Sequence, residues 1–133
     1  IYSKFSIEFI EKTLQDLSNK ELIKLILNKK DIMKIKKLSI LEYAKLVIHI
    51  DKYEFIYIDY YDNILTEYIK IGIYRESANH DREIYLEFNL EKFAEILSLF
   101  KDSKLDLYIY NDNYPVIIGG KDKIGLIAPL VKL

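Results

Sequence analysis

Two segments of this chain, residues 6–19 and residues 89–102, carry the same order of apolar and polar side chains. Their sequences are SIEFIEKTLQDLSN and NLEKFAEILSLFKD, and each opens with a polar residue, an apolar residue and a glutamate. The shared apolar positions are Ile7, Ile10, Leu14 and Leu17 in the first segment and Leu90, Phe93, Leu97 and Phe100 in the second. This spacing predicts two amphipathic helices with polar N-caps. The repeat favours an internally duplicated, pseudo-symmetric domain, with a chance match of two amphipathic stripes as the alternative.

Short segments of alternating apolar and polar residues follow both predicted helices. After the first helix they are residues 45–50, 53–59 and 64–75, and after the second they are residues 105–110, 114–118 and 124–128. Residues 83–88 alternate in the same way just before the second helix. A period of two predicts β-strands, and the turn residues between them predict antiparallel hairpins. We therefore predict an α+β fold, a duplicated strand–helix–three-strand unit whose two helices pack on one face of a continuous antiparallel sheet.

A lysine-rich segment, residues 20–44, separates the first predicted helix from its strands. Its first apolar residues, at positions 22, 23, 26 and 27, keep a helical period, which predicts a helix that ends at Asn28. Residues 32–43 are compatible with either a strand or a helix. We interpret the whole segment as a lysine-rich helical insertion.

The length and composition favour one domain. With 133 residues the chain is long enough to bury a sizeable core. We expect a single domain over residues 1–133, with a first half at about 1–75 that contains the insertion and a second half at about 83–131. The chain has no cysteine, so it has no disulfide framework, and this fits a cytoplasmic protein. No apolar run reaches the ~20 residues of a membrane span, and no signal peptide is visible.

The charges balance over the whole chain but not along it. Twenty basic residues against 21 acidic ones give a net charge of −1, so no overall field attracts nucleic acid. Residues 20–37 nevertheless hold seven lysines and only two acidic residues. Such a local excess of positive charge suits contact with phosphate groups. A solvated lysine-rich face without a ligand is the alternative interpretation.

Few residues suit catalysis or metal binding. His49 and His80 are the only histidines, and a metal site needs further ligands. Asp59 and Asp62 flank a predicted hairpin, where aspartate commonly bonds its own backbone, although a hard cation is an alternative. The glycine pair in residues 119–123 lacks the spacing and the following helix of a phosphate-binding loop. We predict no enzymatic activity, no cofactor and no metal site, and a small metal-dependent nuclease remains as a minor alternative.

The second half of the chain resembles a known family. Residues 83–131 combine an amphipathic helix, a strand, an Asn/Asp turn, the strand YPVII and a last strand that runs into Ala128 and Pro129. This order is similar to one domain of a DNA sliding clamp of the proliferating-cell-nuclear-antigen type, specifically its C-terminal domain. The resemblance implies helices that face a central hole threaded by duplex DNA, and sheets outside that bind partner proteins. Members of that family pass directly from their first helix into the strands, so residues 20–44 depart from the pattern.

The resemblance and the charge distribution together give candidate site residues. The DNA-binding candidates are Lys12, Lys20, Lys24, Lys29, Lys30, Lys92 and Lys101. The resemblance implies that Ala128, Pro129 and Leu130 contact partner proteins, and that the chain forms a homo-oligomer. The outward positions of the second helix have a net charge of −1, which is less basic than a DNA-facing surface requires; they are Glu91, Lys92, Glu95, Lys101 and Asp102.

We predict a non-catalytic, sliding-clamp-like scaffold that binds double-stranded DNA and replication or repair proteins. The alternative is a small α/β protein-interaction module, viral or regulatory, without a DNA function. Abundant Lys, Ile and Tyr suggest an AT-rich genome, and abundant Lys and Glu without Cys are compatible with a thermophilic, archaeal or viral source.

Overall fold

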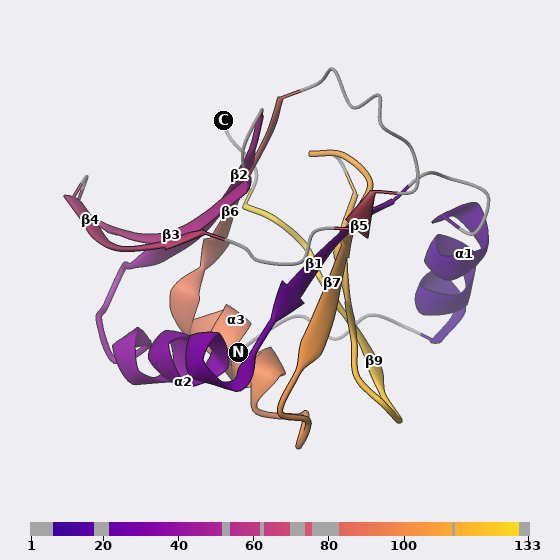
Figure 1. Ribbon diagram of the computed structural model, residues 1–133. Coiled ribbons are helices and arrows are strands. Elements are labelled where there is room, and N and C mark those ends of the chain that lie inside the picture. Colours follow the sequence, from indigo (N-terminus) through magenta and orange to yellow (C-terminus); the bar gives the residue numbers. More distant parts are fainter. Residues whose placement is uncertain are drawn as a thin grey trace.

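A computed structural model describes residues 7–17, 22–51, 54–61, 63–69, 74–75, 83–112 and 114–130. These residues form three helices and nine strands (Figure 1). The helices are α1 (Ile7–Leu17), α2 (Lys29–Leu38) and α3 (Leu90–Leu97). The strands are β1 (Ile23–Leu27), β2 (Lys45–Ile50), β3 (Glu54–Tyr60), β4 (Asn63–Ile69), β5 (Tyr74–Arg75), β6 (Ile84–Asn89), β7 (Leu105–Ile109), β8 (Val116–Gly119) and β9 (Ile124–Ile127).

The strands form two antiparallel sheets that exchange one strand with each other. One sheet, which we call sheet A, has the order β5-β1-β7-β8-β9, and the other, sheet B, has the order β4-β3-β2-β6. Strand β1 pairs with β7, with Ile23 opposite Ile109. Strand β6 pairs with β2 in the equivalent way, with Ile50 opposite Ile84. The first strand of each half therefore lies in the sheet of the other half.

The α+β class and the duplicated strand–helix–three-strand unit are confirmed. The first unit is β1–α2–β2–β3–β4 and the second is β6–α3–β7–β8–β9. Helices α2 and α3 contact each other below the two sheets, and α1 lies on the far side of sheet A (Figure 1). Two details of the prediction are wrong. The helix paired with α3 is α2 and not α1, and the strands form two sheets rather than one.

The predicted lysine-rich insertion is also corrected, because residues 20–44 contain the first strand and helix of the first unit. Residues 23–27 form a strand rather than a helix because Ile23, Leu25 and Leu27 alternate toward the core. Asn28 begins helix α2 instead of ending an earlier helix. Its side chain accepts a hydrogen bond from the Asp31 amide at 3.0 Å, and the Asp31 carboxylate accepts one from the Asn28 amide at 3.2 Å. This capping box fixes the start of α2.

The core fills the space between the two sheets and the α2–α3 pair. Strands contribute every second side chain to it, as with Leu105, Leu107 and Ile109 of β7. Phe88 of β6 and Phe93 of α3 are both almost fully buried, with ring centroids 5.3 Å apart in an edge-to-face arrangement. The strand-to-helix junction of the second unit therefore lies inside the continuous apolar cluster of the core.

Asn89 caps α3 as Asn28 caps α2, and its loss has a measurable cost. The Asn89 side chain accepts a hydrogen bond from the Lys92 amide at 2.9 Å. Replacing Asn89 by alanine leaves that amide unsatisfied, so we expect the free energy of unfolding to fall by about 1 kcal/mol. Urea unfolding followed by circular dichroism measures the change. Glu91→Ala, at an exposed position of the same first turn, is the control and is expected to cost about 0.5 kcal/mol or less.

Candidate nucleic-acid interface

Helix α2 presents the largest group of lysines on the described surface. It carries five lysines and one aspartate, and its buried side consists of Ile32 and Ile35. The lysine side chains are exposed; they are Lys29, Lys30, Lys34, Lys36 and Lys37. The helix therefore fixes one apolar side toward the core and leaves a basic side in solvent. A group of lysines on one side of a helix has the charge that contact with phosphate groups requires, and such contact carries no base readout.

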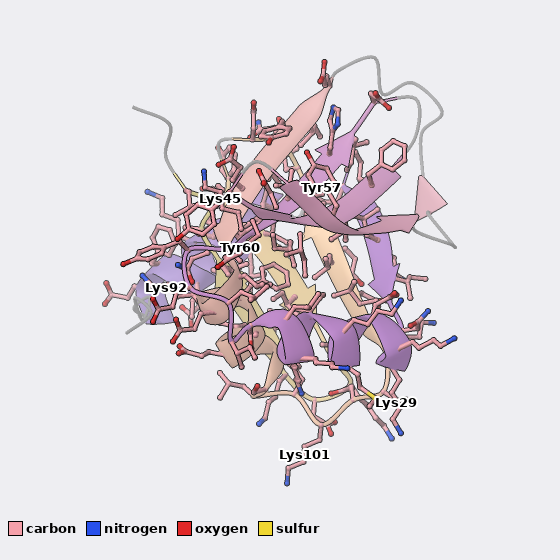
Figure 2. All side chains as sticks on the ribbon, turned by 90° about the vertical axis from the view of Figure 1, so that its left-hand side faces the viewer. Lys29, Lys45, Tyr57, Tyr60, Lys92 and Lys101 are labelled. Atoms are coloured by element: carbon pink, nitrogen blue, oxygen red, sulfur yellow. The ribbon has the colours of Figure 1, made fainter. Side chains whose placement is uncertain are left out.

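Helix α3 carries a weaker and mixed charge. Leu90, Phe93 and Leu97 face the core, and the outward residues Glu91 and Lys92 oppose each other in charge. Figure 2 shows Lys29 and Lys101 at the lower side of the molecule, away from the strand that carries Tyr57, with Lys92 at the left. The positive charge of the helix layer is therefore concentrated on α2.

The structure divides the predicted lysines between two sides of the molecule. Lys29, Lys30, Lys92 and Lys101 lie on or next to α2 and α3, where all four are exposed. Lys12 lies on α1, which packs on the opposite face of sheet A. Lys24 points to that same face from β1, and its Nζ atom lies 3.6 Å from a carboxylate oxygen of Asp106. Lys20 lies outside the described residues.

Three lysines of the α2 surface were not among the predicted site residues. Lys34, Lys36 and Lys37 were counted in the basic segment but were not selected, because residues 32–43 could not be assigned to a helix. The sequence did contain the decisive signal. Asn28 followed by Asp31 is a capping-box pattern at a helix start, and it places all five lysines on one helix.

The predicted partner-binding residues lie where the chain crosses from sheet A to sheet B. After β9, the backbone amide of Leu130 donates a hydrogen bond to the Glu87 carbonyl of β6 at 2.7 Å. This bond ties the tail to the free edge of sheet B. Ala128 is exposed, Pro129 is half-buried and the Leu130 side chain is 45 % exposed. The tail therefore has a fixed backbone and an accessible apolar side chain.

The outward face of sheet B is closed by its own polar and aromatic side chains. The Lys45 ammonium lies 3.1 Å from a Glu87 carboxylate oxygen. Burial, together with a hydrogen bond to Tyr57, raises the pKa of the Tyr85 hydroxyl, which therefore keeps its proton as a hydrogen-bond donor. Val47 lies on this face and is fully buried. The network thus excludes water from the centre of the face.

The described residues contain no group of three or more His, Cys, Asp or Glu side chains that is arranged to hold a metal ion. His49 contacts Glu83, with 2.7 Å between Nε2 and Oε1, and its ring packs edge-on against Tyr85. His80 and Asp62 lie outside the described residues. Of the predicted hairpin turn at residues 119–123, Gly119 ends β8 and residues 120–123 connect it to β9. No helix in the described part is long and apolar enough to cross a membrane.

Comparison with known proteins adds to this geometry. No protein-family model matches the chain. No curated protein matches it either. Among solved structures, the DNA polymerase sliding clamp from Bacillus subtilis superimposes with a TM-score of 0.65 at 14% identity, over 100% of this chain and 35% of that one. The chain has the fold of a DNA sliding-clamp domain.

Two other solved clamps agree with this result. The β subunit of DNA polymerase from Streptococcus pyogenes gives a TM-score of 0.67 at 10% identity, over 98% of this chain and 36% of that one. The β clamp of Helicobacter pylori, bound to a DNA ligase peptide, gives 0.65 at 14% identity, over 98% of this chain and 34% of that one. The chain thus spans about a third of the length of these proteins. The predicted sliding-clamp resemblance is confirmed for the fold, and these structures come from bacteria, so an archaeal or viral source gains no support.

Proposed function

We propose that this chain is a domain of a non-catalytic DNA sliding clamp, which keeps DNA-processing proteins on duplex DNA in the cytoplasm. The observation that carries the proposal is the position of the basic helix α2. It lies in the α2–α3 layer, on the side of the clamp fold that the resemblance predicts to face DNA. The fold and the charge distribution therefore favour the same surface for contact with DNA.

Contact with DNA would be electrostatic and independent of sequence. Lysine ammonium groups on α2 reach phosphate oxygens and release condensed counterions, which gives affinity that falls steeply with salt. Lys29 and Lys30 in the first turn also add to the positive end of the helix dipole. Since α3 is mixed in charge, we expect the phosphate contacts to come mainly from α2, with Lys92 and Lys101 as minor contributors.

Partner proteins would dock on the tail after β9. The H. pylori clamp, which has the same fold in its matching third, was solved with a DNA ligase peptide. In this chain Leu130 offers an accessible apolar side chain on a backbone that is held by Glu87 of β6. An exposed apolar side chain on a fixed backbone can bury its surface against an apolar residue of a bound peptide. Ala128, Pro129 and Leu130 are therefore the proposed partner contacts.

The strand edges favour a head-to-tail assembly of such domains. The outer edge of β1 is paired with β5, and the outer edge of β6 receives the Leu130 amide. In the described residues, the terminal strands are β5 and β9 in sheet A and β4 and β6 in sheet B. Strand β5 has only two residues and β6 is bonded to the tail, which leaves β4 and β9 as the edges for pairing. They lie at opposite sides of the domain (Figure 1). Open edges pair readily with another chain, so β4 of one domain and β9 of the next would join sheet to sheet.

The oligomeric state of the intact protein tests this proposal. A protein that encircles DNA is expected to sediment as a closed oligomer at micromolar concentration and to show rings by negative-stain electron microscopy. Symmetric closure follows from a head-to-tail interface whose rotation closes. A stable monomer without rings would contradict the clamp function. It would favour the alternative of an interaction module without a DNA function, to which the mixed charge of α3 gives some support.

A further inference from the structure

Helix α1 packs on the outer face of sheet A, away from the rest of the helices (Figure 1). Its side chains Ile10, Leu14 and Leu17 form one stripe along the helix and meet apolar side chains of the sheet. The sheet side of this contact consists of Tyr108 of β7, Ile117 of β8 and Leu126 of β9, with Tyr110 and Tyr114 from the loop between β7 and β8 and Leu22 before β1. The outward side of α1 is charged, with Glu8, Glu11, Lys12 and Asp16 all exposed.

The contact between α1 and the sheet is separate from the main core. In β7, Leu107 and Ile109 belong to the main core, whereas Tyr108, like Tyr110 just after the strand, belongs to the α1 contact. In β8, Ile118 belongs to the main core and Ile117 to the α1 contact. Because a strand sends alternate residues to opposite faces, the two clusters share the sheet but not their side chains. Among the described side chains, none from α1 belongs to the main core.

Helix α1 is seated less deeply than α3. Along α3, five residues are buried, including Phe93 and Leu97 at 0 % exposure. Along α1, the buried residues among positions 8–17 are Thr13 and Leu17, and Phe9 is 41 % exposed. Less buried apolar surface means less free energy holding the helix in place. Helix α1 is therefore held less firmly than α3, and unlike α2 it contributes none of its described side chains to the main core.

The duplication supports an added role for α1. Neither duplicated unit includes α1, since the paired helices are α2 and α3. The equivalent outer face of sheet B has no helix among the described residues and is closed by the Lys45–Glu87 pair and by Tyr57 and Tyr85. The outer face of sheet A instead shows tyrosine, isoleucine and leucine beneath α1. A tyrosine-rich apolar face of this kind is typical of protein interfaces.

We propose that the outer face of sheet A is a docking surface for the amphipathic helix of a partner protein, and that α1 occupies it as a resident competitor. The sequence of α1 shows which kind of helix fits this surface. It is a helix with apolar residues at positions i, i+4 and i+7, as in Ile10, Leu14 and Leu17, and an acidic outer side. A partner helix with this pattern displaces α1, so partner binding is weakened by the fraction of molecules in which α1 is docked. This surface is distinct from the tail at Ala128–Leu130 and needs no DNA.

The test uses the full chain with α1 undocked, and a labelled peptide with the sequence of residues 6–19 as the helix probe. Leu14→Asp combined with Leu17→Asp places two charges against the apolar face and releases α1 without changing the main core. We expect this variant to bind the peptide saturably in fluorescence anisotropy, about tenfold or more tightly than the unmodified chain, in which α1 competes. Lys12→Asp, on the exposed side of α1, is the matched control and should bind as the unmodified chain does.

Two further measurements identify the surface. Adding Ile117→Asp to the undocked variant is expected to abolish peptide binding, because Ile117 belongs only to the outer face. Since the chain has no cysteine, a fluorophore on Glu11→Cys reports α1 alone, and excess unlabelled peptide should increase the mobility of that label. The proposal is overturned if the undocked variant, folded by circular dichroism, binds no more tightly than the unmodified chain. Binding that survives Ile117→Asp would overturn it as well.

Discussion

Reversing the charge of two lysines at the start of α2 is expected to weaken the binding of duplex DNA by roughly a hundredfold. The slope of the logarithm of the binding constant against the logarithm of the salt concentration should become shallower by about two. The variant is Lys29→Glu with Lys30→Glu. Each reversal removes a phosphate contact and adds a repulsive charge in its place. Both positions lie in the first helical turn, where acidic residues favour the helix dipole. The fold should therefore be unaffected, and fluorescence anisotropy over a salt series measures the loss.

The division of lysines between two sides of the molecule supplies a matched control. Lys12→Glu with Lys24→Glu changes the net charge by the same amount, but both residues lie on the α1 side of sheet A. We expect this variant to keep most of the affinity. An equal loss in both variants would mean that DNA responds only to the net charge. If neither variant changed the affinity, the α2 surface would be excluded as the DNA contact and an interaction module would be the better explanation.

The parts of the fold that the sequence predicted well are those set by local patterns. Strands β2, β6 and β7 coincide with predicted segments to within about one residue, since each shows a clear period of two with turn residues at its ends. Helix α3 begins after its predicted cap, Asn89. The two-fold plan was also predicted, because strand and helix types recur in the same order.

The errors have physical causes that differ from one element to another. The apolar stripe of α1 matches that of α3. Such a stripe shows that a helix has an apolar side, but it does not show which face of which sheet the helix covers. Strand β1 has five residues, and periodicity does not separate so short an apolar run from a helix. A better alignment was present in the sequence, since Asn28, Ile32 and Ile35 correspond to Asn89, Phe93 and Ile96 in the paired helices. The exchange of β1 and β6 between sheets is a long-range pairing with no local signal.

The same errors explain what was missed in the candidate site. Lys24 was grouped with Lys29 and Lys30 because all three lie in one basic segment of the chain. A strand and a helix send their side chains in different directions, so Lys24 reaches the outer face of sheet A while the other two extend from α2. Counting charges along the sequence identifies a basic segment. Only the assignment of strand and helix within that segment shows which of its lysines share one surface.

Phe93→Ala is expected to lower the free energy of unfolding by about 3–5 kcal/mol, a large part of the ~5–15 kcal/mol that stabilises a domain. The Phe93 ring is fully buried where α3 meets β6, and it packs edge-on against Phe88 with centroids 5.3 Å apart. Its removal leaves a cavity in the main core and also removes the aromatic contact. Phe9→Ala on α1, where the ring is 41 % exposed, makes the same chemical change outside the main core and should cost under about 1 kcal/mol. Urea unfolding of both variants measures the difference, and similar costs would show that α1 contributes to the core as much as α3 does.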